Sequence, residues 1–359
     1  ALLHINSPYV VGAMLGWFSA AHARMIFDHF YGQFPLLQVF GQAGAGKSKT
    51  VDLMLRLHYM LRDPQITSSG DITQHAMQAA CTASVSIPAV FDEYKVREIQ
   101  KNRLDMLRRM FKNSYTRAGI SKGYIDTDAG KSQVSLRHMN FNAPVCFIGE
   151  AIESQTAILE RSVVVNLTKE GRAGRKHNFD KAFDPNNRVV VSRIGSSIVR
   201  AILDGDWRKL KIAHDKNLRT VNDAWGEIAN AGDDRQRFNT AVLMTGLNYT
   251  RSVIHGRFGE RFDETFDDLM GAVLNDSSSR TLSVVRKVQS ELAKVVGALA
   301  YDRERGRFHL FQAKAFVLAT GGIGRAFSIT SNSWEYTADG HSLAYHAGAE
   351  LSGIECYQI

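Results

Sequence analysis

The sequence has few cysteines and no hydrophobic run long enough to cross a membrane. Cys81, Cys146 and Cys356 are far apart and show no C-x-x-C spacing. This argues against a disulfide framework and a zinc site, and it suits a reducing compartment. The apolar stretch from Tyr9 to Ala21 is too short for a bilayer and reads as a core helix, and no signal peptide is found. We therefore expect a cytoplasmic protein without a membrane partner.

The amino-acid composition excludes few other classes of protein. A hydrophobic content of 44% and a charged content of 22% are ordinary for a globular protein, and 359 residues leave room for two or more units. The net charge of +8 permits a polyanionic partner without demanding one. The chain starts at Ala1 rather than Met and stops at Ile359 without a closing element, as expected of a fragment.

Residues 41–48 match the phosphate-binding pattern G-x-x-x-x-G-K-[ST] at every position. In such a loop, backbone N–H groups surround phosphate oxygens, Lys47 supplies a charge for the β- and γ-phosphates, and the Ser48 hydroxyl can bind Mg²⁺. The context fits, because residues 35–40 predict a buried strand and residues 50–57 an amphipathic helix. The predicted nucleotide-binding residues are Gly41, Gly44, Ala45, Gly46, Lys47, Ser48 and Lys49.

A second motif is an apolar run over residues 86–91 that ends in Asp92 and Glu93. After a phosphate loop, a strand of this kind typically carries an Asp that holds Mg²⁺, so we predict Ser48 and Asp92 as metal ligands. Glu93 is placed to activate the attacking water, which favours a hydrolase over a kinase. The alternative is that both carboxylates are a solvated strand end.

These patterns predict an α/β fold: a three-layer P-loop NTPase core, a following helical region and a β-rich C-terminal fragment. Residues 116–137 read as a loop or hairpin, and a further hairpin is expected around Gly306. The predicted divisions are an N-terminal helical segment over residues 1–30, the core over 31–186, the helical region over 187–295 and the fragment over 296–359.

Residues of about 9–280 resemble the ATPase module of phage and mobile-element primase–helicases, within the class that includes AAA+ proteins and superfamily-3 helicases. The resemblance rests on the phosphate loop and on residues 87–93, 143–150 and 157–164. It implies ATP hydrolysis by a ring-forming homo-oligomer that acts as a motor on DNA, with ATP and Mg²⁺ as cofactors.

The same resemblance implies roles for residues outside the two motifs. Glu150 or Asn142 would sense the γ-phosphate. Arg161 would reach the ATP of the next protomer in the ring, as a catalytic residue beside Lys47 and Glu93. Alternatively, Arg161 is a surface residue at a helix C-terminus. DNA binding depends on the resemblance more than on charge, because the basic residues also fit a solvated helix face and loop. The candidate DNA contacts are Arg103, Arg108, Arg109, Lys112, Arg117 and Lys122.

Residues of about 296–359 resemble part of the succinate dehydrogenase and fumarate reductase flavoprotein family. The matching motifs are residues 313–322, 330–332, 337–341 and 344–351. In that family, the Ala-Thr-Gly-Gly turn and a Thr-Gly-Asp-Gly motif help to hold FAD, and here Ala338 replaces the first glycine of the second motif.

The rest of such an enzyme has no counterpart in this chain. No G-x-G-x-x-G follows a first strand, and the Gly322-Ile323-Gly324 run lacks its third glycine. FAD is therefore not expected, and the ATP-driven motor is the leading hypothesis. Two alternatives are an FAD-dependent flavoprotein fragment and a non-catalytic chimeric remnant. A sequencing join, a rearranged gene or a deliberate chimera would explain why the two resemblances occur in one chain.

Overall fold

The computed structural model describes residues 1–59, 66–69, 72–126, 133–153, 155–226, 233–292, 298–302, 304, 306–311, 319, 321–322 and 338–346. Its contacts divide the chain into two compact units, Ala1–Thr281 and Leu282–Ile359. The four-part division expected from the sequence stays a prediction.

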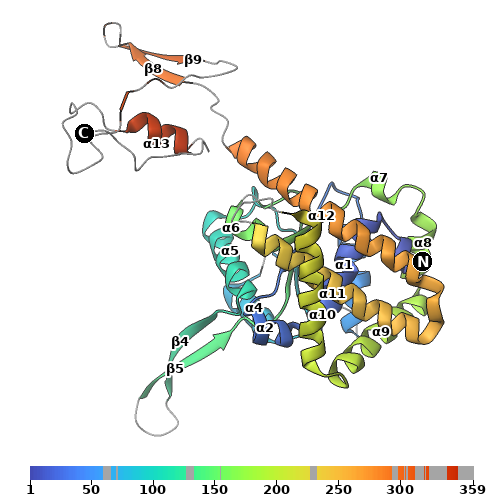
Figure 1. Cartoon of the computed structure of the whole chain (residues 1–359). Coiled ribbons are helices and arrows are strands. Elements are labelled where there is room, and N and C mark those ends of the chain that lie inside the picture. The colour runs from blue at the N-terminus through green and yellow to red at the C-terminus, as the bar shows by residue number, and fades with distance from the viewer. Residues whose placement is uncertain are drawn as a thin grey trace. The chain divides into compact units, whose positions relative to one another are not determined.

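Unit 1 begins with two helices and continues as alternating strands and helices before a mostly helical half (Figure 1). The elements up to the end of the sheet are η1 (Leu2–His4), α1 (Pro8–Ala21), α2 (Arg24–Tyr31), β1 (Leu36–Phe40), α3 (Lys47–Leu55), η2 (Arg56–His58), β2 (Thr67–Ser68), α4 (Gln74–Thr82), β3 (Ala89–Asp92), α5 (Lys101–Tyr115), β4 (Gly119–Asp126), β5 (Gln133–Asn140), β6 (Val145–Gly149), α6 (Thr156–Leu159) and β7 (Ser162–Asn166). The helices that follow are α7 (Lys169–Arg172), α8 (Lys176–Phe183), α9 (Pro185–Leu203), α10 (Trp207–Trp225), α11 (Asp233–Phe258), η3 (Gly259–Phe262) and α12 (Asp263–Leu292).

The central sheet has five strands in the order β2-β3-β6-β1-β7, and every neighbouring pair is parallel. Phe40 at the end of β1 is level with Gly149 of β6 and Asn166 of β7. All five carboxyl ends therefore meet at one edge of the sheet, which is where ligands bind in open α/β sheets. The predicted α/β class is confirmed and its sheet is parallel, while the P-loop NTPase class stays a prediction.

Both faces of this sheet are covered, which explains why its strands are apolar throughout rather than alternating. Leu37 and Val39 of β1 enter one hydrophobic cluster with α1, α3 and α11. Leu36 of the same strand and Phe147 of β6 enter a second cluster with α4 and α5. The strands thus lie between two layers of helices.

The stretch expected to be helical from Tyr9 to Phe30 is two helices, α1 and α2. Helix α1 is buried almost all round, and Gly16 lets it approach α11 so closely that a Cβ there would lie 2.4 Å from the Leu243 carbonyl oxygen. Within the described ranges, no single helix is long and apolar enough to cross a membrane. The pair α1 and α2 passes that test only when taken together, with a bend of 81° between them.

Two hairpins agree with the sequence-based expectations. Strands β4 and β5 pair antiparallel, and in Figure 1 this hairpin extends away from the helices and central sheet of unit 1. In unit 2, β8 (Ala298–Asp302) pairs antiparallel with β9 (Arg307–Phe311) around Gly306, and α13 (Asp339–His346) follows later. Much of the β-rich fragment expected over residues 296–359 lies outside the described residues.

Candidate functional site

The loop over residues 41–48 lies between the carboxyl end of β1 and the start of α3. Gly41 has φ +148°, and a Cβ there would lie 2.0 Å from the carbonyl oxygen of Leu167, so only glycine fits. Gly46 has φ +83°, which is also a glycine conformation. Steric limits therefore explain both glycines of the pattern. At Gly41 the loop backbone packs against Leu167, which directly follows β7.

The N-terminus of α3 has no side-chain cap. Gly46 is its N-cap residue, and the first return bond inside the helix runs from the Thr50 N–H to the Gly46 carbonyl, at 2.9 Å. The N–H groups of residues 47–49 precede that bond and have no partner within the helix. They lie at the positive end of the helix dipole, where an anion is stabilised.

Lys47 lies folded over its own loop. Its Nζ donates to the carbonyl oxygens of Gly41 at 2.7 Å and Gln42 at 3.1 Å. Lys47 is half-buried, and its ammonium group has three N–H donors in all. An anion bound in the loop would compete with the two carbonyl oxygens for these donors. Ser48 is half-buried and Lys49 is exposed.

The Asp92-Glu93 pair lies at the same edge of the sheet. Asp92 ends β3, two strands away from β1, which is a spacing of about 10 Å between backbones. Its Oδ1 accepts the Glu93 N–H at 2.7 Å, and Glu93 Oε2 accepts the Ser68 hydroxyl at 3.1 Å. Glu93 has φ +57°, an uncommon conformation for a residue with a side chain. Topology and the local turn therefore place both carboxylates on the edge that carries the loop.

The other predicted residues divide between the two edges of the sheet. Glu150 directly follows β6 and lies at the carboxyl edge with the loop. Asn142 precedes β6, at the opposite edge, where its Oδ1 accepts the Arg117 Nε at 2.7 Å. Arg161 also lies at that opposite edge, because its carbonyl accepts the Leu36 N–H at the start of β1.

The structure thus does not bring Arg161 to the loop of its own chain. Its Nη1 donates to the Ala157 carbonyl at 2.6 Å, and its guanidinium lies 5.6 Å from the centre of the Tyr115 ring. Burial, followed by the nearby Arg235, lowers the pKa of Arg161. Action on a second copy of the chain stays a prediction.

A buried polar network beside the Asp92-Glu93 turn has no sequence pattern that reveals it. Glu153 is fully buried and accepts Arg108 Nη2 at 2.6 Å and Nε at 3.1 Å, the Gln155 N–H at 2.8 Å, and the Tyr94 hydroxyl. Burial alone would raise the pKa of Glu153, but the hydrogen bonds from Arg108 and Tyr94 outweigh it and lower the pKa. This network holds Tyr94, the residue after Glu93.

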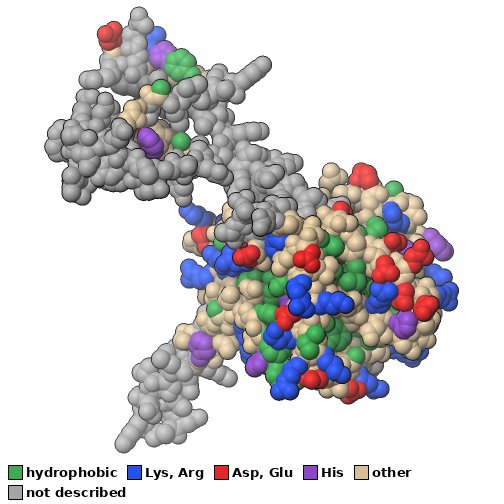
Figure 2. Space-filling view, viewed as in Figure 1, with side chains coloured by type: hydrophobic (Ala, Val, Ile, Leu, Met, Phe, Trp, Pro, Cys, Tyr) green, Lys and Arg blue, Asp and Glu red, His purple; other side chains and the backbone are tan. Residues whose placement is uncertain are grey.

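The candidate DNA contacts do not form one free basic surface. Arg108 is committed to Glu153, and Arg117 is bound to Asn142. Arg103 and Arg109 line a polar cavity of about 640 Å³ between α4 and α5. The side chain of Lys122 lies outside the described residues. On the face drawn in Figure 2, Lys and Arg side chains of unit 1 are interspersed with Asp and Glu rather than gathered. DNA binding and ring assembly stay predictions.

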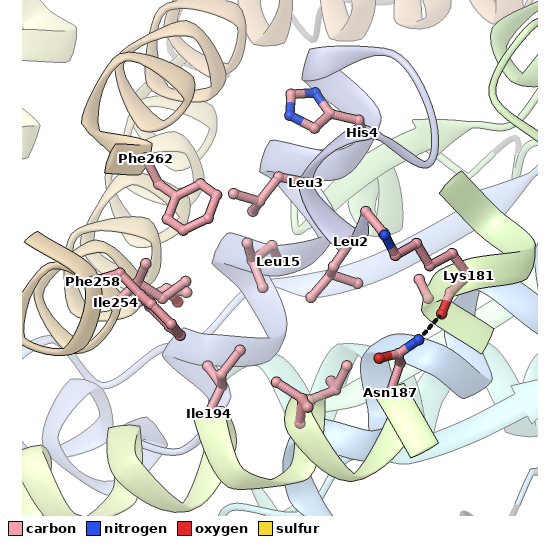
Figure 3. A pocket seen from close by; sticks show the side chains of 15 residues that line it. Leu2, Leu3, His4, Leu15, Lys181, Asn187, Ile194, Ile254, Phe258 and Phe262 are labelled. Atoms are coloured by element: carbon pink, nitrogen blue, oxygen red, sulfur yellow. Dashed lines mark hydrogen bonds between the residues drawn. The ribbon is translucent and has the colours of Figure 1, made fainter. Parts of the chain in front are cut away.

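A second cavity, of about 270 Å³, is apolar (Figure 3), and the described residues that line it include none from the loop over residues 41–48. Leu3, Leu15, Ile194, Ile254 and Phe262 point into it from η1, α1, α9, α11 and η3. The described residues that line it include no carboxylate. Among the described residues of the whole chain, no group of three or more His, Cys, Asp or Glu side chains could hold a metal ion.

Comparison with known proteins finds similarity to flavoproteins. A family model described as "FAD binding domain" matches residues 243–359. L-aspartate oxidase of Halalkalibacterium halodurans is 30% identical over 116 residues, which are 32% of this chain and 22% of that protein. The fumarate reductase flavoprotein subunit of Mycobacterium tuberculosis is 42% identical over 65 residues, or 18% of this chain and 11% of that protein.

A third relative, the FAD-dependent oxidoreductase MJ0033 of Methanocaldococcus jannaschii, is uncharacterised. It is 45% identical over 63 residues, which are 18% of this chain and 12% of that protein. The chain spans between 11% and 22% of the length of the curated relatives it matches.

Among solved structures, one described as SCCmec type IV Cch, active helicase, gives a TM-score of 0.47 at 16% identity, covering 82% of this chain and 52% of that one.

These findings correct the leading hypothesis. The flavoprotein matches contradict the predicted ATP-driven motor on DNA, and they contradict the prediction that FAD is not expected. That prediction rested on the missing G-x-G-x-x-G. Because the chain spans at most 22% of these relatives, a motif missing from this stretch does not bear on whether the enzyme binds FAD. The matches support the FAD-dependent alternative, over residues that do not include the phosphate loop.

Proposed function

We propose that residues 243–359 are part of an FAD-dependent oxidoreductase and contribute to its FAD site. The observation that carries the proposal is the match of the FAD binding domain over this range. The relatives named as L-aspartate oxidase and fumarate reductase support the same reaction class. When bound, FAD supplies a ring that accepts a hydride from the substrate.

The described geometry of unit 2 fits this proposal at two turns. Gly321 has φ +84° within the Ala-Thr-Gly-Gly turn, a conformation that lets backbone approach a ligand closely. Ala338 has φ +69° immediately before α13, a left-handed backbone that glycine adopts more readily than alanine, and the flavoprotein motif has a glycine at this position. The Ser342 N–H donates to the Ala338 carbonyl at 2.9 Å and closes the first turn of α13.

These two turns define the residues that would hold the cofactor. Gly321 and Gly322 would bring backbone N–H groups to it. Gly340, a buried position at the start of α13, would leave room for the cofactor because glycine has no side chain. The visible absorption spectrum of the purified protein tests the proposal. We expect a flavin absorbance band that remains after exhaustive dialysis; a colourless protein that takes up no added FAD would contradict the proposal.

A second binding function is supported by the geometry of unit 1. We propose that the loop over residues 41–48 binds the phosphate groups of a nucleotide. The supporting observation is the combination of left-handed glycines, the uncapped N-terminus of α3 and the Lys47 amine over one loop. Ser48 and Asp92 supply oxygen ligands of the kind that Mg²⁺ prefers at the same sheet edge.

Titration calorimetry with ADP and with inorganic tripolyphosphate tests the loop. Lys47→Ala removes one charge-assisted bond to phosphate and should weaken binding by at least about tenfold. Lys209→Ala, an exposed lysine on α10, is the matched control and should bind as the unaltered protein does. Equal affinities for both variants would refute the assignment of Lys47.

A further inference from the structure

The segment that follows β7 lies directly against the phosphate loop. The Leu167 N–H donates to the Phe40 carbonyl at 2.8 Å, and the Leu167 carbonyl oxygen closes over Gly41. Helix α7 starts two residues later, and its Thr168 cap accepts the Gly171 N–H at 3.0 Å. The end of β7 therefore fixes where the side chains of this short helix can reach.

Two cations of α7 reach back over the loop. A Cβ built on Gly46 would lie 2.2 Å from Nη1 of Arg172, so the guanidinium rests on the backbone of the α3 N-cap. A Cβ built on Gly44 would lie 3.8 Å from Cε of Lys169. The Arg172 guanidinium is also held in place by the Phe179 ring, whose centre is 4.7 Å away.

Together with Lys47, these side chains place three positive charges around the positive end of the α3 dipole. Within the part of the chain that the structure describes, neither Lys169 nor Arg172 makes an ion pair with a carboxylate, including Glu170 on the same helix. Like charges at a helix N-terminus repel each other and the dipole, and an anion bound among them removes that cost. Arg172 presents a fork of N–H donors that matches phosphate oxygens.

We propose that Arg172 and Lys169 are two further ligands of the phosphate chain that the loop binds, and that the site selects at least two linked phosphates over one. This inference rests on the proposed phosphate binding by residues 41–48. Arg172 lies over Gly46 and Lys169 over Gly44, so a diphosphate or longer chain along the loop would meet both cations, each with a different phosphate group.

The test uses titration calorimetry of the full chain with inorganic phosphate, pyrophosphate, tripolyphosphate and ADP. We expect Arg172→Ala and Lys169→Ala each to weaken pyrophosphate and ADP binding, by about tenfold for the arginine, and to flatten the dependence of affinity on salt. Arg172→Lys should restore part of the affinity, because it keeps the charge and loses the fork.

Arg188→Ala is the matched control, since this guanidinium also lies over a phenylalanine ring, Phe183, at 5.1 Å. It should bind as the unaltered protein does. Lys169 is exposed, so its variant reports on binding even if Arg172→Ala perturbs the fold.

The two proposals fail in distinguishable ways. Loss of binding in Lys47→Ala with unchanged binding in the Arg172 and Lys169 variants would overturn the role of α7 and leave the loop proposal standing. No pyrophosphate or ADP binding by the unaltered chain would overturn both. Equal affinity for phosphate and pyrophosphate would overturn the selection for linked phosphates.

Discussion

Replacing Glu153 by alanine should be among the most destabilising single changes in unit 1. The carboxylate is fully buried and accepts four hydrogen bonds, two of them from Arg108. Its removal leaves the Arg108 guanidinium, whose side chain is only 18% exposed, beside an unpaired Tyr94 hydroxyl. Losing one partner of a buried pair costs about 3–5 kcal/mol. We expect about 3 kcal/mol here, because water can reach part of Arg108.

Chemical denaturation followed by far-ultraviolet circular dichroism measures this loss. Glu98→Ala is the matched control, since it also removes a carboxylate from an ion pair, but one that is exposed, with Lys95. That change should cost less than about 1 kcal/mol. Equal costs for the two variants would refute the structural role of the Glu153 network.

The same network predicts a dependence on pH. The folded-state pKa of Glu153 is lowered, so its contribution to stability is complete above the ordinary carboxyl pKa and is lost as the pH falls through the folded-state value. The difference in stability between the unaltered protein and Glu153→Gln should therefore shrink on acidification.

Three further outcomes follow from the packing and titration of other residues. Gly246→Ala should destabilise unit 1 by about 1–3 kcal/mol in a denaturation experiment, because its Cβ would lie 1.9 Å from the Gly16 carbonyl oxygen. A Cβ at Gly256 on the same helix would meet nothing within 4 Å, so Gly256→Ala should instead stabilise unit 1. If both variants changed the free energy of unfolding in the same direction, the result would contradict the close crossing of α1 and α11. Ala338→Gly should slow hydrogen exchange of the α13 amides, because it relieves a left-handed backbone at φ +69°; faster exchange would contradict that geometry. Burial lowers the pKa of His22 to about 4, so folding stability should fall as the pH drops from about 6.5 to about 4, by up to about 3 kcal/mol. A His22→Gln variant with the same slope would show that another group is responsible.

Much of the central sheet could be predicted from the sequence because its strands are buried on both faces. The apolar runs that end in Phe40 and Phe91 predict strands, and each is a strand of the parallel sheet. The loop after β1 follows from local chemistry, since its glycines have conformations that other residues avoid.

The edge on which a residue lies could not be predicted, because it depends on strand order and direction. Asn142 and Glu150 are eight positions apart, yet they lie at opposite ends of β6. Arg161 lies at the far edge for the same reason. The contacts of Glu153 with Arg108 and of Arg172 with Gly46 could not be predicted either, because the partners are distant in sequence and no pattern joins them.

The C-terminal part gives the main correction to the predictions from the sequence. The motifs around Gly321 and Ala338 lie within the residues that the FAD binding domain matches, whereas the missing G-x-G-x-x-G leads to the wrong prediction that FAD is not expected. The family match begins at residue 243, within α11, well before the boundary expected near residue 296. Because the chain covers at most 22% of these relatives, a motif missing from it does not exclude FAD binding.

Titration of the chain with FAD, followed by the quenching of flavin fluorescence, tests the central proposal most directly. Gly340→Val places a branched side chain at the start of α13 and should abolish binding, whereas Ser342→Val alters an exposed position of the same helix and should not. Lys47→Ala should also leave FAD binding unchanged, because the proposed flavin site lies within residues 243–359. Saturable binding lost only in Gly340→Val is the predicted result. No saturable binding, or binding lost in Lys47→Ala and kept in Gly340→Val, would contradict the assignment of this stretch to an FAD site.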